Sequence, residues 1–321
     1  MRARITSHPR LGDLALVVAA ICFGSTFLVV QDAVALVEPI PFLAMRFLVG
    51  AAVLAPLARR RPSSPGEVRD GLLAGLALTV GYVLQTVGLQ YTGSATSAFI
   101  TYLLVVFVPV LSVVVLRRRP HRATLLGIVV AVVGLVLLTG PGGGDGGFGR
   151  GEILTLGCAV AFASHVVILG VTAHKHDPIR LAAIQVATVG GLCAIPGVWL
   201  GGYGFPASAV AAAVATAVVA TALAFVLQVA GQRSVPPTRV ALLLLLEPVS
   251  AAVAASVRGD SLDAKQLGGA ALILVAVVIS EVAPALLDRR VNTREAGADN
   301  DRSQPVTPDR HQQEAGGFEV G

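Results

Sequence analysis

Long apolar segments dominate the hydropathy pattern of this chain, with short polar or charged stretches between them. About 20 helical residues, at a rise of about 1.5 Å each, cross a hydrocarbon core about 30 Å thick. Ten segments reach that length, so the pattern predicts an all-α integral membrane protein with ten transmembrane helices. A transmembrane barrel would instead show alternation over about ten residues. The expected spans are residues 11–31, 40–58, 71–89, 94–115, 122–139, 151–172, 179–197, 208–230, 238–257 and 265–285.

Positive charges gather in alternate loops between these spans. Clusters such as Arg59–Arg61 and Arg117–Arg119 lie on one side, while the other loops hold only Arg150, Arg258 and Lys265. Loops rich in Lys and Arg stay in the cytoplasm. We therefore expect a multi-pass protein of the cell (inner or plasma) membrane with both termini cytoplasmic.

A second copy of the segment from Gly12 to Arg46 begins at Gly151. Aligned without a gap, Glu38-Pro39-Ile40 faces Asp177-Pro178-Ile179. Five spans per half is an odd number, so the second half enters the membrane in the opposite sense, as an inverted-topology repeat. The expected parts are a cytoplasmic N-terminal tail (1–10), a first five-helix repeat (11–140), a Gly-rich external linker (141–150), a second repeat (151–285) and a disordered cytoplasmic tail (286–321).

The composition agrees with a membrane protein and narrows the chemistry. Of the 321 residues, 55% are hydrophobic and 13% charged, whereas soluble domains carry about 25% charged residues. The net charge of +5 does not indicate nucleic-acid binding, because the Arg residues form short clusters between apolar runs. Cys22, Cys158 and Cys193 have neither CxxC nor Cys/His ligand spacing. We expect no metal and no cofactor.

Arg46, Glu247 and His165 are ionisable residues well inside expected spans, where a charge is costly unless it is paired or hydrated. Arg46 could line a cavity, pair with Glu247, or extend to the outer interface. Glu247 either lines a cavity or bonds backbone groups freed by the following Pro248. His165 is either a hydrogen-bonded helix contact or part of a proton relay.

Uncharged polar residues form helical faces on several spans. Ser94, Ser97 and Thr101 share one face, as do Thr221, Gln228 and Gln232 on another span. These faces would line a cavity between the halves, or form interhelical hydrogen bonds. The predicted cavity residues are Ser25, Arg46, Tyr82, Gln85, Ser97, Thr101, His165, Gln228 and Glu247.

Two further features concern movement and coupling. Pro109 and Pro248 interrupt corresponding helices of the two halves and are the predicted hinges, although simple kinks would satisfy them too. Asp32 shares a face with Ser25 near the outer mouth. Glu247 and Asp32 are the candidates for coupling transport to a proton gradient. The repeat-related halves differ at Arg46, which aligns with Gln185, and we expect substrate at such asymmetric positions.

The chain resembles the drug/metabolite transporter superfamily, in its bacterial EamA type, over residues 12–283. The resemblance rests on Phe23-Gly24-Ser25-Thr26-Phe27, Met45-Arg46-Phe47, Gly88-Leu89-Gln90-Tyr91, Val108-Pro109-Val110 and Leu246-Glu247-Pro248-Val249. It implies an inner-membrane carrier that moves small metabolites, amino acids or toxic compounds, mostly outward and without ATP. The family has a Gly-Glu pair after its fourth and ninth spans. This chain has Gly259-Asp260 in the second half and only Arg117–Arg119 in the first.

The sequence thus favours a secondary carrier whose two halves rock about a midplane cavity, with a small-molecule substrate and the lipid bilayer as partners. A channel or lipid flippase on the same scaffold is the alternative. An integral membrane enzyme has only the adjacent Ser164 and His165 as support, and helix neighbours point about 100° apart, so they cannot pair. Substrate, coupling ion and oligomeric state stay open at this stage.

Overall fold

The computed structural model describes residues 9–92, 94–117, 122–139, 149–259 and 263–279, and these residues contain helices and no strand. Eight described helical segments are long and apolar enough to cross a membrane. Two shorter apolar helices, Thr124–Thr139 and Ala264–Ile279, lie where the fifth and tenth spans were expected. The all-helical membrane fold is confirmed, and the count of ten stays a prediction. Most of the expected linker and the whole expected C-terminal tail lie outside the described residues.

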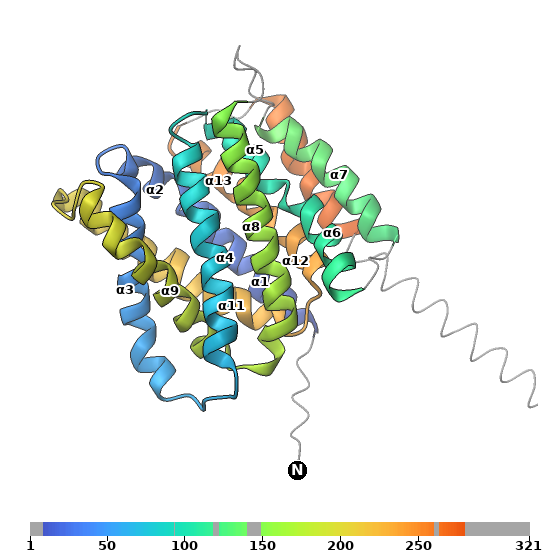
Figure 1. The fold of residues 1–321 in the computed structure, drawn as a ribbon. Coiled ribbons are helices and arrows are strands. Elements are labelled where there is room, and N and C mark those ends of the chain that lie inside the picture. The colour runs from blue at the N-terminus through green and yellow to red at the C-terminus, as the bar shows by residue number, and fades with distance from the viewer. Residues whose placement is uncertain (1–8, 93, 118–121, 140–148, 260–262, 280–321) are drawn as a thin grey trace, which may run out of the picture. The chain divides into compact units, whose positions relative to one another are not determined.

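Several spans consist of two consecutive helices (Figure 1). The helices are α1 (Pro9–Ser25), α2 (Phe27–Val34), α3 (Pro39–Arg59), α4 (Glu67–Gly88), α5 (Ser94–Tyr102), α6 (Leu104–Leu116), α7 (Arg122–Thr139), α8 (Arg150–Thr172), the 3-10 turn η1 (Ala173–Lys175), α9 (Pro178–Trp199), α10 (Ala207–Thr216), the π-helix η2 (Ala217–Leu223), α11 (Ala224–Gln232), α12 (Pro237–Leu244) and α13 (Leu246–Val257). The helix Ala264–Ile279 follows.

The repeated acidic-Pro motif marks the start of α3 and α9. The Asp177 carboxylate accepts hydrogen bonds from the backbone N–H groups of Ile179 and Arg180, at 3.0 and 3.3 Å. Pro178 occupies the first helical position, where no N–H is needed. Glu38 and Pro39 hold the same positions before α3, where the Glu38 side chain makes no capping bond. The motif therefore sets where the corresponding helices of the two halves begin.

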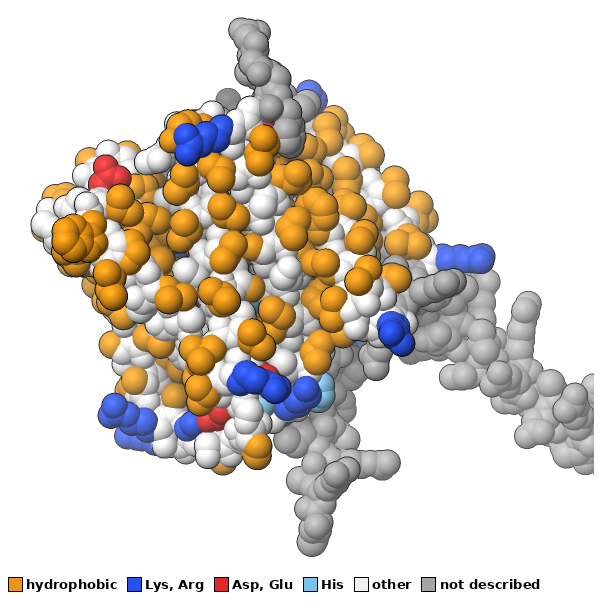
Figure 2. All heavy atoms as spheres, viewed as in Figure 1, with side chains coloured by type: hydrophobic (Ala, Val, Ile, Leu, Met, Phe, Trp, Pro, Cys, Tyr) orange, Lys and Arg blue, Asp and Glu red, His pale blue; other side chains and the backbone are white. Residues whose placement is uncertain are grey.

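Helix α4 packs through its small residues and exposes several of its large ones. A Cβ added at Gly75 would lie 2.9 Å from the backbone oxygen of Gln185 on α9, so only glycine permits this approach. Leu72, Leu76 and Val80 are 48%, 51% and 42% exposed on the same helix. This pattern is typical of a helix that faces lipid. Figure 2 shows hydrophobic side chains covering the middle of one face of the molecule.

Helices of the first repeat pack mainly against helices of the second. Helix α3 lies along α9, α4 contacts both α8 and α9, and α1 contacts α11 and α13. Helix α7 approaches the last described helix closely, since a Cβ at Gly134 would lie 2.8 Å from the Gly269 oxygen. These interleaved contacts join the two sequence halves. The expected rocking of the halves about a midplane cavity stays a prediction.

Candidate functional site: a cavity beside three interrupted helices

A cavity of about 790 Å³ lies among the spans. This volume falls in the range of small-molecule sites, about 300 to 1,000 Å³. Its lining includes loop residues 35–38, 90 and 201–202, so the cavity opens at the end of the bundle that carries these loops. We call this the open end. The loops 60–66, 173–177 and 233–236 lie at the opposite, charged end, and none of their described residues lines the cavity.

Three spans are interrupted next to this cavity. The breaks lie at Thr26 between α1 and α2, at Leu103 between α5 and α6, and at Leu245 between α12 and α13. Leu103 and Leu245 have nearly the same backbone angles, φ −60° and ψ −7° against φ −66° and ψ −8°. The Thr26 hydroxyl donates to the Cys22 and Phe23 carbonyls, at 2.9 and 3.0 Å, and so satisfies acceptors at its break. Discontinuous helices beside a binding site are typical of transporters.

The predicted hinge prolines lie in two of these spans, but the breaks come earlier. Pro248 is in the first turn of α13, three residues after the break at Leu245. Pro109 lies inside α6, further from the break at Leu103. The first turn of a helix needs no donor from Pro, so α13 can begin with Pro248 in place. The sequence identified these two interrupted spans but not the residues at which they break.

Arg46 points into the bundle from α3 and is held by the π-helix η2. Its Nε donates to Thr221 Oγ1 at 2.9 Å, and its Nη2 donates to the Ala220 carbonyl at 3.3 Å. The residue is 5% exposed and lines the cavity. Extension to the interface is therefore excluded. The direct Arg46–Glu247 ion pair considered from the sequence is not formed, and Thr221 and Ala220 take its place.

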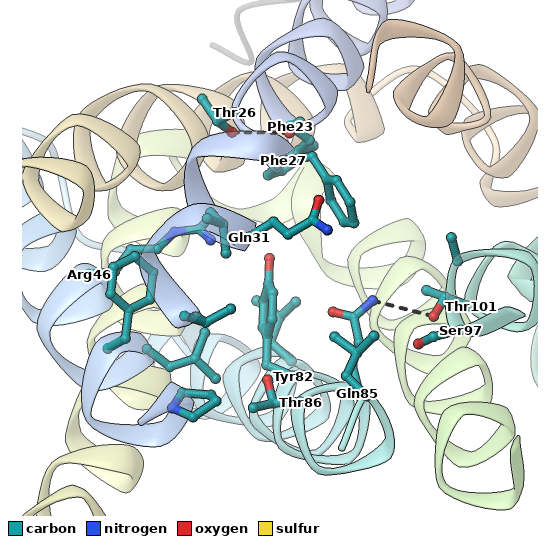
Figure 3. Close-up of a pocket in the computed structure, with 18 of the residues that line it drawn as sticks. Phe23, Thr26, Phe27, Gln31, Arg46, Tyr82, Gln85, Thr86, Ser97 and Thr101 are labelled. Carbon is teal, nitrogen blue, oxygen red and sulfur yellow. Dashed lines mark hydrogen bonds between the residues drawn. The ribbon is translucent and has the colours of Figure 1, made fainter. Parts of the chain in front are cut away.

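Gln85, Ser97 and Thr101 also line the cavity, and they bond neighbouring helices at the same time. Gln85 Nε2 donates to Thr101 Oγ1 at 3.3 Å (Figure 3). The hydroxyls of Ser97 and Thr155 lie 3.5 Å apart. Figure 3 shows Tyr82 projecting from the same helix as Gln85, beside Gln31. For Gln85, Ser97 and Thr101, cavity lining and interhelical bonding, the two interpretations of the polar faces, therefore both hold.

Glu247 and Gln228 complete the polar lining on the second-repeat side. Glu247 lies in the first turn of α13, where the positive end of the helix dipole stabilises a carboxylate. The Tyr102 side chain interacts with it. Gln228 is 3% exposed on α11. His165 Nε2 lies 2.7 Å from Gln185 Oε1, so His165 forms the expected buried helix contact and also lines the cavity.

A buried polar cluster joins helices of both repeats at the charged end. Arg180 on α9 bonds Glu67 on α4, and its Nη1 also donates to the Ala58 carbonyl at 3.2 Å. His176 bridges Ser64 and Asp70, with its Nδ1 at 2.7 Å from Ser64 Oγ and its Nε2 at 2.9 Å from Asp70 Oδ2. We call the group Ser64, Glu67, Asp70, His176 and Arg180 the polar cluster. It closes the bundle at the end opposite the cavity mouth.

The sequence profile of the EamA-like transporter family matches the chain twice, over residues 10–140 and 149–281. The chain belongs to the EamA-like transporter family, within the drug/metabolite transporter superfamily.

Similar proteins agree with the EamA assignment. An uncharacterized transporter of Archaeoglobus fulgidus is 31% identical over 269 residues, which cover 83% of this chain and 84% of that protein. A second one from the same organism is 27% identical over 84% of this chain and 96% of its own length. A solved structure titled "Crystal structure of protein" superposes with a TM-score of 0.72 at 22% identity, covering 86% of this chain and 98% of its own. At that identity it supports the fold alone.

Two predicted EamA site residues lie outside the cavity lining. The Ser25 side chain is exposed and bonds the Cys22 carbonyl at 3.4 Å, whereas the next residue, Thr26, lines the cavity. Asp32 pairs with Arg258 at 2.6 Å, and its side chain is 66% exposed. The break at Thr26 explains the first correction, because it changes the helical register that the sequence pattern assumed. The second correction is explained by the exposed ion pair with Arg258, which holds Asp32 outside the cavity lining.

Apart from Tyr82, the sequence reasoning missed the aromatic part of the lining. Six of the 11 Phe and two of the 4 Tyr residues in the chain line the cavity. Several pack edge to face, including Tyr82 against Phe162, with ring centroids 5.2 Å apart, and Phe23 against Phe225, also at 5.2 Å. An aromatic residue in an apolar span does not reveal whether it faces lipid or a cavity. The unusual gathering of aromatics becomes visible only in the fold.

Proposed function

We propose that this EamA protein is a secondary transporter that moves a small organic molecule across the cell membrane by alternating access, with export as the expected direction. The observation that carries the proposal is a cavity beside interrupted helices that opens at one end of the bundle and is closed at the other. A carrier needs a site that reaches one side at a time. A channel would need a path through both ends.

The charge distribution supports an orientation for this cavity. The charged end carries Arg59–Arg61, Lys175 and Arg233, and loops with this excess of positive charge stay in the cytoplasm. Figure 2 shows Lys and Arg side chains near the end where α3 finishes and α4 starts. The open end would then face outward, and both termini would be cytoplasmic. The structure would correspond to an outward-open state.

The repeat suggests how the other state would form. Two loops near the cavity mouth touch each other, since a Cβ at Gly201 would lie 2.8 Å from Glu38 Cγ. Their repeat-related counterparts are the two loops joined by Ser64 and His176. In an inverted repeat the two halves exchange roles between the outward and inward states. The inward-open state would thus require the polar cluster to separate.

The interactions that would separate are chemically asymmetric. In the polar cluster, Arg180 and His176 occupy the repeat positions of Pro41 and Val37 near the open end. Closure at the charged end therefore depends on ion pairs and hydrogen bonds, whereas Pro41 and Val37 at the mouth are apolar. Glu247 remains the candidate for proton coupling because it lines the cavity.

A two-stage experiment tests the proposal. A deletion strain and an overexpressing strain are compared for the efflux and toxicity of a library of small metabolites and drugs, and any compound that responds is then tested in proteoliposomes. A carrier gives saturable uptake that is accelerated by unlabelled compound on the opposite side. Flux that neither saturates nor shows this counterflow would indicate a channel instead. Uptake with and without an imposed pH gradient then decides whether protons are coupled.

A further inference from the structure

One buried cation in the cavity has only neutral hydrogen-bond partners. Arg46 is 5% exposed, and its two hydrogen bonds go to a hydroxyl and to a backbone carbonyl. Among the described residues, no carboxylate lies within the 4 Å that defines an ion pair with Arg46. A buried charge normally requires a partner of opposite sign. The wall of the cavity therefore holds a positive charge that its immediate neighbours do not neutralise.

The donors of this guanidinium are divided between the protein and the cavity. Nε and Nη2 are held by Thr221 and Ala220, while Nη1 makes no hydrogen bond to any described residue. Nη1 is also absent from the described buried polar atoms that lack a partner, so it lies at accessible space. Because Arg46 lines the cavity, that space belongs to the cavity. Nη1 is positioned to donate to a bound molecule.

The backbone of η2 fixes the orientation of Arg46. This segment is a π-helix, in which the shift from i→i+4 to i→i+5 bonding is often found at functional sites. Within it, the Ala220 carbonyl accepts from Arg46 Nη2, and the adjacent Thr221 hydroxyl accepts from Nε. Two neutral acceptors hold the plane of the guanidinium without cancelling its charge. This is the arrangement expected of a preorganised anion-recognition residue.

The other charged residue deep in the lining, Glu247, interacts with the Arg46 charge at longer range but forms no ion pair with it. Glu247 lies on α13, near Tyr102 and in the first turn of its own helix. Glu38 lies at the mouth, before α3. The Arg46 charge is therefore available to a ligand, and the aromatic lining around Tyr82, Phe162 and Phe225 provides surface for a planar apolar body.

We propose that the transported molecule carries a carboxylate on a planar, apolar body, and that Arg46 is the residue that binds this carboxylate. The inference rests on the proposed function, because it assumes that the cavity is the transport site. Arg46 then determines specificity through charge, and the aromatic wall accepts the rest of the molecule. A charge-assisted hydrogen bond from a preoriented Arg side chain to a carboxylate is about twice as strong as a hydrogen bond between neutral groups.

Three probes with the same ring and different charge test this inference: phenylacetate, phenylacetamide and phenethylamine. Binding to the purified full-length protein in detergent is followed by the rise in melting temperature with probe concentration and by equilibrium dialysis. We expect phenylacetate to bind and the neutral and cationic probes to bind at least about tenfold more weakly, since neither can form a charge-assisted hydrogen bond with Arg46 through a carboxylate. Equal or tighter binding of phenethylamine, or no binding of phenylacetate, would overturn the inference.

Substitutions assign the effect to Arg46. Arg46→Gln should abolish the phenylacetate shift, and Arg46→Lys should retain part of it, because lysine keeps the charge but loses the planar fork. Arg150→Gln is the matched control, since Arg150 lies over the Tyr91 ring, 4.7 Å from its centroid, and does not line the cavity. It should bind phenylacetate as the wild type does. Should Arg46→Gln fail to fold, Thr221→Val takes its place and should weaken phenylacetate binding.

The outcome separates this inference from the proposed function. Arg46-dependent phenylacetate binding without any counterflow in proteoliposomes would contradict transport while leaving the binding assignment intact. Counterflow of a cationic or neutral compound, unaffected by Arg46→Gln, would support a carrier and refute the carboxylate assignment. Phenylacetate binding that survives Arg46→Gln unchanged would refute it as well.

Discussion

Substitution of Glu67 by glutamine is expected to open the charged end of the bundle more often. Glu67 is 3% exposed and is the anionic partner of Arg180, whose side chain is 23% exposed. Removing one partner of a buried ion pair costs about 3 to 5 kcal/mol. The glutamine oxygen still accepts a hydrogen bond, and Arg180 keeps the Ala58 carbonyl. We therefore expect a smaller loss of about 2 kcal/mol, which changes the ratio of the two states roughly 30-fold.

Cysteine labelling from the cytoplasmic side measures this change. In a chain whose Cys22, Cys158 and Cys193 are replaced by alanine, Thr86→Cys places a reporter in the cavity lining. An impermeant maleimide added to inside-out vesicles reaches Thr86→Cys only when the charged end opens. When opening of the charged end is rapid and labelling is slow, the labelling rate is proportional to the fraction of molecules in which that end is open. Glu67→Gln should raise the labelling rate roughly 30-fold.

The control uses an exposed ion pair that Asp70 of the cluster makes with Arg69, a residue outside it. Arg69 bonds Asp70 at 2.9 Å, but its side chain is 76% exposed. Exposed pairs contribute about 0.2 to 1 kcal/mol, so Arg69→Gln should raise the rate less than about fivefold. Labelling in right-side-out vesicles shows that each variant is folded and its cavity intact. An unchanged cytoplasmic-side rate in folded Glu67→Gln, or an equal rise in Arg69→Gln, would refute the assignment of the polar cluster as the inner closure.

Three further predictions follow from packing and burial. Gly75→Leu should prevent accumulation of folded protein or lower its melting temperature, because the added side chain meets α9 at the backbone; Gly191→Ala, with nothing within 4 Å of its Cβ, should be neutral. Gln185→Leu should destabilise the protein by about 1 to 3 kcal/mol in detergent unfolding, since it leaves His165 without its partner. If Glu247 carries the coupled proton, Glu247→Gln should remove the response of uptake to an imposed pH gradient, whereas Asp32→Asn should keep it because Asp32 is exposed and paired. The reverse result would exchange the two roles.

The sequence was sufficient for the eight long spans because hydrocarbon thickness fixes their length and lipid fixes their composition. It also placed Arg46, Gln85 and Glu247 at the cavity, since each is a polar group whose burial in a span is costly without partners. The acidic-Pro motif before α9 gave the start of that helix, through the Asp177 cap.

The sequence could not show where helices are interrupted, or which residues pair when they lie far apart in the chain. The periodicity argument assumes a continuous helix. Because the helix is interrupted at Thr26, Thr26 lines the cavity and Ser25 is exposed. Glu67 and Arg180 lie at the ends of their spans, where a charge is expected only because flanking charges set the orientation of the protein in the membrane. Their pairing at the charged end depends on α4 packing against α9, which no local pattern shows.

The interleaved packing has a consequence for synthesis. Arg46 and its partner Thr221 are 175 residues apart in the chain. At a synthesis rate of about 5 to 20 residues per second, the α3 segment is made roughly 10 to 35 seconds before η2 exists. During this interval the guanidinium must be sheltered by water, lipid headgroups or the insertion machinery. The residue that we assign to substrate recognition is thus also one whose charge the nascent protein must tolerate before its own fold can accommodate it.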